Sequence, residues 1–448
     1  MSDVPAEQEH SADTYTESIA SQPTGATTVT GRSGSTAEVS AFPTLADIEA
    51  ARGTIAGVVR VTPMETSQML ADVLGGPVHL KCENLQRTGA YKIRGAYNRL
   101  SALSPEERAR GVVAASAGNH AQGVAMAARE LGIHATIFMP EGVALPKLQA
   151  TRRYGADTVL HGTSVEEALA AAKAFAVDTG AVFIPPFDHP DVIAGQGTLG
   201  LEILDQVPDV ETVVVPIGGG GLVSGIAIAL RAMSERLGRR IRVIGVQSEH
   251  AASYPPSLRA GAPTTIATTP TIADGIAVAR PGELNFPIVR DLVDEIVTVS
   301  DDEVAKALLL LLERAKLVVE AAAAVGVAAI MAGTIHDTGR TVVLLSGGNI
   351  DPLMMERVIT RGLVAARRYV AVHIMLPDRA GQLARVAQVI SDAGANVVEV
   401  LHTRHGQGLE ISEVALELSV EARGPEHAEE VVERLREAGF RPQIQTSR

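Results

Sequence analysis

A single lysine, Lys92, lies in a stretch of small residues, Thr-Gly-Ala-Tyr-Lys-Ile-Arg-Gly-Ala, that runs from Thr88 to Ala96. Gly89 allows a tight turn, and Gly95 leaves room for another segment to pack closely. A lysine amine held in such a pocket loses hydration, which lowers its pKa and frees it to act as a nucleophile or a base. Taken alone, the Lys-Ile-Arg triplet is more typical of an ordinary lysine at a helix start, so the rest of the chain must decide between the two interpretations.

Three polar or glycine-rich segments directly follow apolar stretches that read as β-strands. They are 116–120 (Ser-Ala-Gly-Asn-His), 216–222 (Pro-Ile-Gly-Gly-Gly-Gly-Leu) and 346–349 (Ser-Gly-Gly-Asn). The four glycines open a helix near Leu222, so their bare amides can converge on an anion with help from the helix N-terminus. The run lacks the lysine of a nucleoside triphosphate loop and the spacing of a dinucleotide fingerprint. It therefore predicts a phosphate site of another kind, and a merely flexible loop is the alternative.

The elements that must position these residues alternate between strands and helices from Val78 to Ile350. Seven of the predicted strands are 112–115, 135–139, 158–160, 182–184, 212–215, 243–246 and 342–345. Short apolar strands followed by alanine-rich helices predict an α/β fold with mostly parallel, buried sheets and helices on both faces. Ligands bind at the strand ends of such sheets. Pyridoxal phosphate suits these strand ends because it needs a lysine for its Schiff base, amides for its phosphate and a partner for its ring nitrogen.

Four motifs, the lysine segment and the three strand-end loops, resemble in order those of the threonine dehydratase (threonine ammonia-lyase) branch of the β-family, or fold type II, of pyridoxal phosphate enzymes. The resemblance covers Thr44 to Arg361. It implies that Lys92 binds the cofactor covalently and then acts as the base at the substrate's Cα. It also implies that Asn119 bonds the cofactor's 3-hydroxyl and that Ser346 faces its ring nitrogen.

The resemblance further implies two sets of backbone contacts. The phosphate would be held by Gly218, Gly219, Gly220, Gly221 and Leu222. The substrate carboxylate would be held by the loop of Ser116, Ala117, Gly118, Asn119 and His120. We expect the His120 side chain to be structural rather than an acid–base group.

The activity implied is β-elimination of water from L-threonine, which gives 2-oxobutanoate and ammonia, and from L-serine, which gives pyruvate. A serine hydroxyl at 346 can donate to an unprotonated ring nitrogen, which favours rapid loss of a β-substituent. A serine racemase is one alternative, although related racemases carry serine where this chain has Ala117. Cysteine and cystathionine synthases fit less well, because their corresponding loop is of the Thr-Ser-Gly-Asn-Thr type. A catalytically inactive amino-acid sensor is opposed by the retained Lys92.

The family's divalent-metal site is incomplete in this sequence. Gln247 stands where metal-binding relatives have glutamate, and Ser253 stands where they have aspartate. Neutral oxygens hold a divalent cation poorly without carboxylates. We therefore predict that no metal binds there.

The composition of the chain changes at both ends. Residues 1–43 are rich in serine, threonine, glycine and acids, which predicts a disordered tail before a catalytic domain over 44–365. Residues 369–448 predict the order β-α-β-β-α-β of a ferredoxin-like module. Segments 378–383 and 394–397 resemble an ACT regulatory domain, which implies a small amino-acid effector, with isoleucine or valine as candidates by analogy. A dimerisation module without a ligand is the alternative.

Charge and hydropathy limit the partners. The net charge of −13 argues against nucleic acid or an anionic membrane surface. The longest uncharged piece of the most apolar region, Ala321 to Gly333, is shorter than the roughly 20 residues that span a bilayer. With one cysteine and no secretory signal, we expect a cytoplasmic enzyme. Paired ACT modules suggest a homo-oligomer, a dimer or a tetramer.

Overall fold

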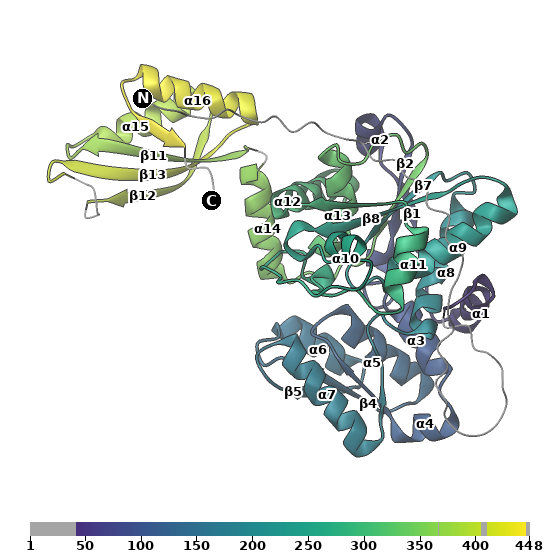
Figure 1. The fold of residues 1–448 in the computed structure, drawn as a ribbon. Helices are drawn as coiled ribbons and strands as arrows, with labels where there is room; N and C mark the ends of the chain where they lie inside the picture. The colour runs from purple at the N-terminus through teal and green to yellow at the C-terminus, as the bar shows by residue number, and fades with distance from the viewer. Residues whose placement is uncertain (1–41, 366, 405–409, 445–448) are drawn as a thin grey trace, which may run out of the picture. The chain divides into compact units, whose positions relative to one another are not determined.

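The structure is a computed structural model that describes residues 42–365, 367–404 and 410–444. Nearly all of the predicted tail lies outside these ranges, so the prediction for 1–43 is not addressed by the structure. Figure 1 shows two groups of strands and helices up to α14 (Pro352–Ala365), followed by a separate α+β module.

The larger sheet has six strands in the order β1-β2-β10-β7-β8-β9. The bounds are Met64–Thr66 (β1), Val78–Cys82 (β2), Thr341–Leu345 (β10), Thr212–Pro216 (β7), Arg242–Ser248 (β8) and Glu295–Val299 (β9). β1 is antiparallel to β2, and the other neighbours are parallel. This arrangement brings the carboxyl ends of β7 and β10 to the same edge, which is where ligands bind in such sheets.

Helices cover both faces of this sheet because its side chains alternate between two cores. Val214 and Val343 point into one core, which includes residues of α2 (Gln68–Leu74), α12 (Asp301–Leu310) and α13 (Ala321–Met331). Val213 and Val342 point into the other, with residues of α8 (Pro190–Gln206), α9 (Gly221–Leu237), α10 (Tyr254–Ala260) and α11 (Asn285–Leu292). Strands that are apolar on both faces are the expected pattern for a parallel sheet between helix layers.

The smaller sheet has four parallel strands in the order β5-β4-β3-β6. They are Asp157–Leu160 (β5), Ala135–Met139 (β4), Val112–Ala115 (β3) and Val182–Phe183 (β6). One face packs on α3 (Ile93–Ser101), α5 (Asn119–Leu131) and α6 (Leu145–Arg153), and the other packs on α7 (Val165–Thr179). Figure 1 shows α6, α5 and α7 around β4 and β5. The remaining helices of this part of the chain are α1 (Leu45–Ile55) and α4 (Pro105–Arg110).

The C-terminal module has the predicted order β-α-β-β-α-β. Its elements are Tyr369–Pro377 (β11), Gln382–Asp392 (α15), Asn396–Thr403 (β12), Glu413–Glu421 (β13), Pro425–Glu437 (α16) and Pro442–Ile444 (β14). The four strands form an antiparallel sheet in the order β12-β13-β11-β14. The inward side chains of β11 belong to this module's own core, as their alternation predicts.

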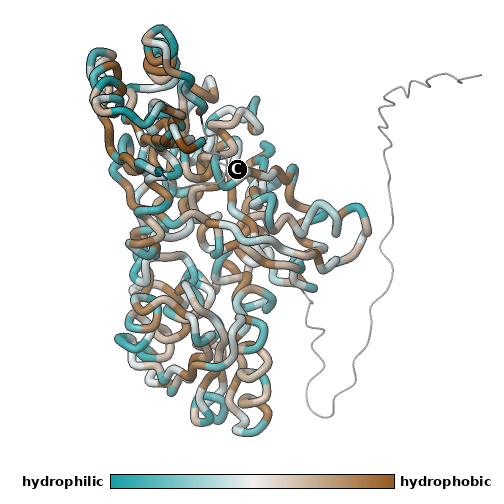
Figure 2. The backbone as a smooth tube through the Cα atoms, turned by 90° about the vertical axis from the view of Figure 1, so that its left-hand side faces the viewer, coloured by the Kyte–Doolittle hydropathy of each residue, from teal (hydrophilic) through white to brown (hydrophobic). Residues whose placement is uncertain are grey.

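The sequence-predicted fold class is confirmed, and the seven strands predicted before residue 350 begin and end within two residues of the observed ones. β9 was not predicted. Thr44 caps α1 through a capping box with Asp47, and the helix ends at Ile55. Figure 2 shows brown, hydrophobic pieces alternating with teal ones along the tube. No helix among the described residues is both long and apolar enough to cross a membrane.

Candidate active site

A cleft of about 590 Å³ opens between the carboxyl ends of the two sheets. Every residue that the sequence proposed for catalysis or binding borders it. They are Lys92, Ser116, Ala117, Gly118, Asn119, His120, Gly218, Gly219, Gly220, Gly221, Leu222 and Ser346. The fold therefore brings together segments that are up to 250 residues apart in the chain, as expected for strand ends at a common edge.

Lys92 is held from both sides of the cleft. It immediately precedes α3, and the backbone before it joins the end of β10: the Tyr91 N–H donates to the Ser346 carbonyl at 3.1 Å, and Ala90 forms an isolated bridge with Gly347. From the small sheet, α5 approaches so closely that a Cβ at Gly123 would lie 3.2 Å from the Lys92 carbonyl carbon. Burial lowers the pKa of Lys92 to about 8, against the opposing effect of Glu320. The Lys92 Nζ donates to the Pro186 carbonyl at 2.8 Å.

The glycine run connects β7 to α9 by a path that only small residues can follow. Gly220 has φ of 107°, in the left-handed region, and is the N-cap of α9. A Cβ there would overlap the Tyr254 hydroxyl, which donates to the Gly219 carbonyl at 3.2 Å. A Cβ at Gly219 would overlap the Phe187 ring. The first backbone N–H groups of α9 have no acceptor within the helix. Residues 218–222 border the cleft, so these N–H groups can bind an anion there.

The loop after β3 ends at the N-terminus of α5 and carries two polar side chains with different surroundings. The Asn119 Nδ2 donates to both carboxylate oxygens of Glu320, at 2.8 and 3.0 Å, and its Oδ1 accepts from the Asn349 Nδ2 at 2.9 Å. His120 Nε2 lies 2.9 Å from the Ile184 carbonyl oxygen. Burial, together with the charge of Lys92, lowers the pKa of His120 to about 3, so this ring is neutral at physiological pH.

Glu320 is a cleft residue that sequence reasoning missed. It directly precedes α13 and is only 8% exposed. Burial raises the pKa of Glu320 to about 7, although its bonds from Asn119 oppose that shift. The available signal was its position: it is one charge inside an otherwise uncharged stretch, Leu317 to Met331, where a solvated surface face is not expected.

The donors of this cleft fit pyridoxal phosphate. Ser346 is 3% exposed overall and borders the cleft, and no hydrogen bond joins its hydroxyl to another described residue. This hydroxyl can therefore donate to a ligand in the cleft. A neutralisable lysine, free helix amides and this hydroxyl match the aldehyde, the phosphate and the ring nitrogen of the cofactor.

Beneath the cleft, Arg94 belongs to a buried ionic cluster. Its guanidinium bonds both oxygens of Glu83, at 2.8 and 2.9 Å, and lies 2.9 Å from Glu202, which also pairs with Lys81 at 2.6 Å. The Arg94 side chain is 1% exposed. Because Arg94 is two residues after Lys92, this cluster fixes the start of α3 and thereby the backbone that carries the amine.

The position of the family's metal site holds Gln247 and Ser253. The Gln247 side chain forms hydrogen bonds with the backbone of Ala251 and Tyr254. The predicted absence of a metal there stays a prediction.

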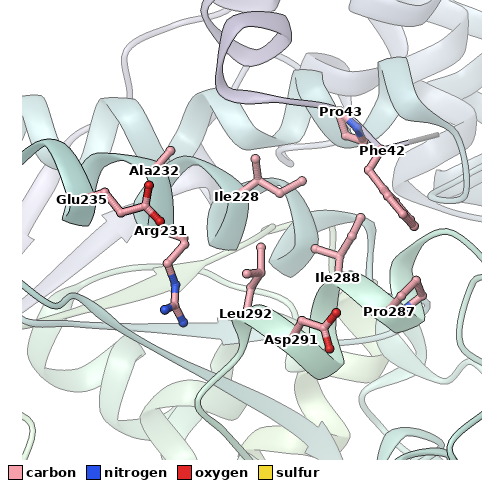
Figure 3. Close-up of a pocket in the computed structure, with 10 residues that line it drawn as sticks. All are labelled: Phe42, Pro43, Ile228, Arg231, Ala232, Glu235, Pro287, Ile288, Asp291 and Leu292. Carbon is pink, nitrogen blue, oxygen red and sulfur yellow. The ribbon is translucent and has the colours of Figure 1, made fainter. Parts of the chain in front are cut away.

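A second groove, of about 330 Å³, lies between α9 and α11 (Figure 3). Its walls include Phe42, Ile228 and Leu292, and none of the proposed site residues borders it.

Comparison with known proteins shows the family to which the chain is related. The sequence profile of the family described as "Pyridoxal-phosphate dependent enzyme" matches residues 55–347, and that of the ACT domain matches 370–440. The chain is 47% identical over 401 residues to an L-threonine ammonia-lyase of Thermotoga maritima, covering 90% of this chain and 99% of the relative. It is 48% identical over 383 residues to one of Geobacter sulfurreducens, covering 85% and 94%.

Solved structures give the same fold. The processed form of threonine deaminase isoform 2 from Solanum lycopersicum superposes with a TM-score of 0.67 at 37% identity, covering 71% of this chain and 92% of that one. Maize serine racemase also has a TM-score of 0.67, at 36% identity, with 72% and 98% covered. The family's fold is thus shared by enzymes that carry different names.

We predict that Arg94→Met lowers the free energy of unfolding by about 3 to 5 kcal/mol, because it leaves the buried Glu83 without its cation and Glu202 with Lys81 alone. Chemical denaturation followed by circular dichroism measures this change. Arg52→Met is the matched control, since Arg52 pairs with Asp205 at the surface and should cost less than about 1 kcal/mol. Equal effects of the two substitutions would contradict the structural role of the cluster.

Proposed function

The chain belongs to the family of pyridoxal-phosphate dependent enzymes, and from this premise we propose that it is an L-threonine ammonia-lyase. It converts L-threonine to 2-oxobutanoate and ammonia, and L-serine to pyruvate and ammonia. The observation that carries the proposal is one cleft bordered by the Lys92 amine, the glycine run, Asn119 and Ser346. Two relatives that bear this name and cover at least 85% of the chain support it.

The cofactor would be held by residues of both sheets. Lys92 is its covalent attachment point, and the amides of 218–222 bind its phosphate at the positive end of α9. Asn119 contacts its 3-oxygen, and the Ser346 hydroxyl donates to its ring nitrogen. When bound, pyridoxal phosphate supplies an electron sink that stabilises negative charge at the substrate's Cα.

The protein's own groups bind the substrate and move protons. The loop 116–120 and the N-terminus of α5 bind the substrate carboxylate through backbone amides. Lys92 removes the proton from Cα, and its pKa near 8 leaves part of the amine neutral at physiological pH. His120 orients this loop through the Ile184 carbonyl and does not titrate in the working range.

Elimination is favoured over racemisation by the residue between Ser116 and Gly118. Ala117 borders the cleft with a methyl group, which cannot deliver a proton to the opposite face of Cα. A serine racemase function is the second candidate, because the maize serine racemase structure is a close structural neighbour. Ala117 is the specific observation against it.

The ACT module gives the enzyme an amino-acid effector site. We propose isoleucine as an inhibitor and valine as an opposing effector, both chosen by analogy. We also propose that the enzyme works in the cytoplasm as a homo-oligomer, a dimer or a tetramer, because ACT modules act in pairs.

Lys92→Ala is expected to abolish formation of 2-oxo acid from L-threonine and L-serine, because it removes both the attachment point and the base. A coupled 2-oxo acid assay measures this effect. Lys173→Ala, at the rim of the same cleft, is the control. Appearance of D-serine from L-serine without 2-oxo acid would favour the racemase instead.

In the wild type, the rate at which pyridoxal phosphate becomes covalently attached should rise with pH through about 8, since only the neutral amine reacts. Absorbance spectroscopy measures this rate.

Gly220→Ala is expected to weaken pyridoxal phosphate binding by at least about tenfold, because a Cβ at this left-handed position overlaps Tyr254 and displaces the glycine run that would bind the phosphate. Fluorescence titration with the cofactor measures the affinity. Gly238→Ala is the matched control: it has φ of 63° at the other end of α9, with open space around it. It should cost about 1 kcal/mol of stability and leave the affinity unchanged. Unchanged affinity in Gly220→Ala would remove the phosphate role of this turn.

L-isoleucine is expected to raise the KM for L-threonine several-fold and to raise the Tm, because an effector that binds the folded state stabilises it. Initial-rate kinetics and thermal melts measure both, and D-isoleucine serves as the control. If neither changes with isoleucine or valine, the effector assignment is wrong, whereas the lyase assignment stands on turnover alone.

A further inference from the structure

Glu320 is a buried acid at the cleft for which the proposed reaction has no role. Its carboxylate accepts two hydrogen bonds from Asn119, and its backbone N–H donates to the Gly347 carbonyl at 3.0 Å. Among the described residues it has no ion-pair partner within 4.0 Å. A buried carboxylate without a counter-ion is costly, so its retention at the cleft calls for a purpose other than stability.

The amide of Asn119 is clamped between two neighbours. Its Oδ1 accepts from the Asn349 Nδ2, which also donates to the Thr88 carbonyl at 2.7 Å, so this nitrogen faces Asn119 as a donor. On the other side the ionised carboxylate of Glu320 accepts only. Both neighbours therefore demand the same orientation of the amide, with its oxygen toward Asn349 and its nitrogen toward Glu320.

Protonation of Glu320 removes one side of this clamp. A neutral carboxyl carries its own O–H donor, so it no longer requires the Asn119 nitrogen to face it, and the amide is then held in its orientation by Asn349 alone. The charged groups that face Glu320 come from three elements: Lys92 before α3, Lys147 on α6 and Asp274 in a short 3-10 helix (Asp274–Ile276). Lys147 and Asp274 pair with each other at 3.0 Å and act on Glu320 in opposite directions.

Burial therefore decides where Glu320 titrates. Lys147 and Asp274 shift the pKa of Glu320 in opposite directions. Desolvation of the Glu320 carboxyl raises its pKa to about 7, although Asn119 and Lys92 oppose that shift. Tyr91 also faces Glu320, and burial holds the pKa of its hydroxyl above the usual range, so that hydroxyl stays neutral. A change in the protonation of Glu320 near neutral pH would therefore change the clamp.

We propose that Glu320 is the positioning residue that orients the Asn119 amide toward the cofactor, and that taking up a proton on Glu320 releases this amide. The proposal rests on the proposed function, because Asn119 is assigned there to the cofactor's 3-oxygen. It assigns Glu320 no contact with the substrate and no transferred proton in the reaction.

The test is a pH titration of the absorbance of the bound cofactor in the holoenzyme, from pH 5.5 to 9. The wild type should show a transition near pH 7 and a matching acidic limb in kcat/KM. Glu320→Gln should lose both, with kcat/KM about tenfold lower and flat with pH, because glutamine accepts without a charge and does not titrate. Glu320→Asp, which keeps an ionisable group, should retain a transition at a shifted pH.

Asp274→Asn is the matched control, since it removes a neighbouring charge without touching Asn119. Because Asp274 raises the pKa of Glu320, the transition should move to lower pH and persist. This variant also tests the proposal if Glu320→Gln fails to fold. In an Asn119→Ala background, Glu320→Gln should have no further effect on the titration.

Three results would overturn the inference: a transition that survives in Glu320→Gln, one that does not move in Asp274→Asn, or an effect of Glu320→Gln that is as large without Asn119. These outcomes are separate from failure of the proposed function. A wild-type chain that binds no pyridoxal phosphate or does not deaminate L-threonine refutes the function itself, whereas normal turnover with an unaltered titration refutes only the role of Glu320.

Discussion

Removal of the Lys92 amine from water is the constraint on which the rest of the site depends. A lysine amine in water is mostly protonated at neutral pH, so only a small fraction of it can attack an aldehyde or take a proton from carbon. The fold removes that water by bringing two sheets together, with α5 packed on the Lys92 backbone and the end of β10 bonded to Tyr91. Elements from both sheets therefore contribute to the burial that lowers the pKa of this lysine.

The protein treats its buried charges in two different ways. Beneath the cleft, Arg94, Glu83, Glu202 and Lys81 are paired directly, so their charges persist and hold α3 in place. In the cleft, no described residue forms an ion pair with Lys92 or Glu320, and burial lowers the pKa of Lys92 to about 8 and raises that of Glu320 to about 7. The ion pairs of Arg94 and Lys81 therefore fix the structure next to a cleft whose Lys92 and Glu320 can exchange protons near neutral pH.

What the sequence could predict follows from how local each signal is. Three patterns can each be recognised within about ten residues of sequence: Lys92 among small residues, four glycines after a β-branched strand, and the alternation in β11. Glu320 is not, because its role arises only when α13 begins beside Asn119, about 200 residues earlier in the chain. β9 was also missed: Glu295 and the exposed Thr298 leave only three apolar residues in this short strand. The position of Glu320 in an uncharged stretch is a local sign of burial, but only long-range contact decides its role.

The side chains that can donate or accept a proton in this cleft explain why it favours elimination. His120 borders it, but burial and Lys92 keep that ring neutral, and its Nε2 is engaged by Ile184. Ala117 has no proton to give. Lys92 is the proposed attachment point, and the Glu320 carboxylate is engaged by Asn119 of the loop 116–120. Racemisation requires a second group that returns a proton to the opposite face of Cα, and the position related racemases use for it is occupied here by a methyl group. Loss of the β-hydroxyl as water needs one proton, and the proton that Lys92 would take from Cα can supply it, so elimination needs no second acid in this set of side chains.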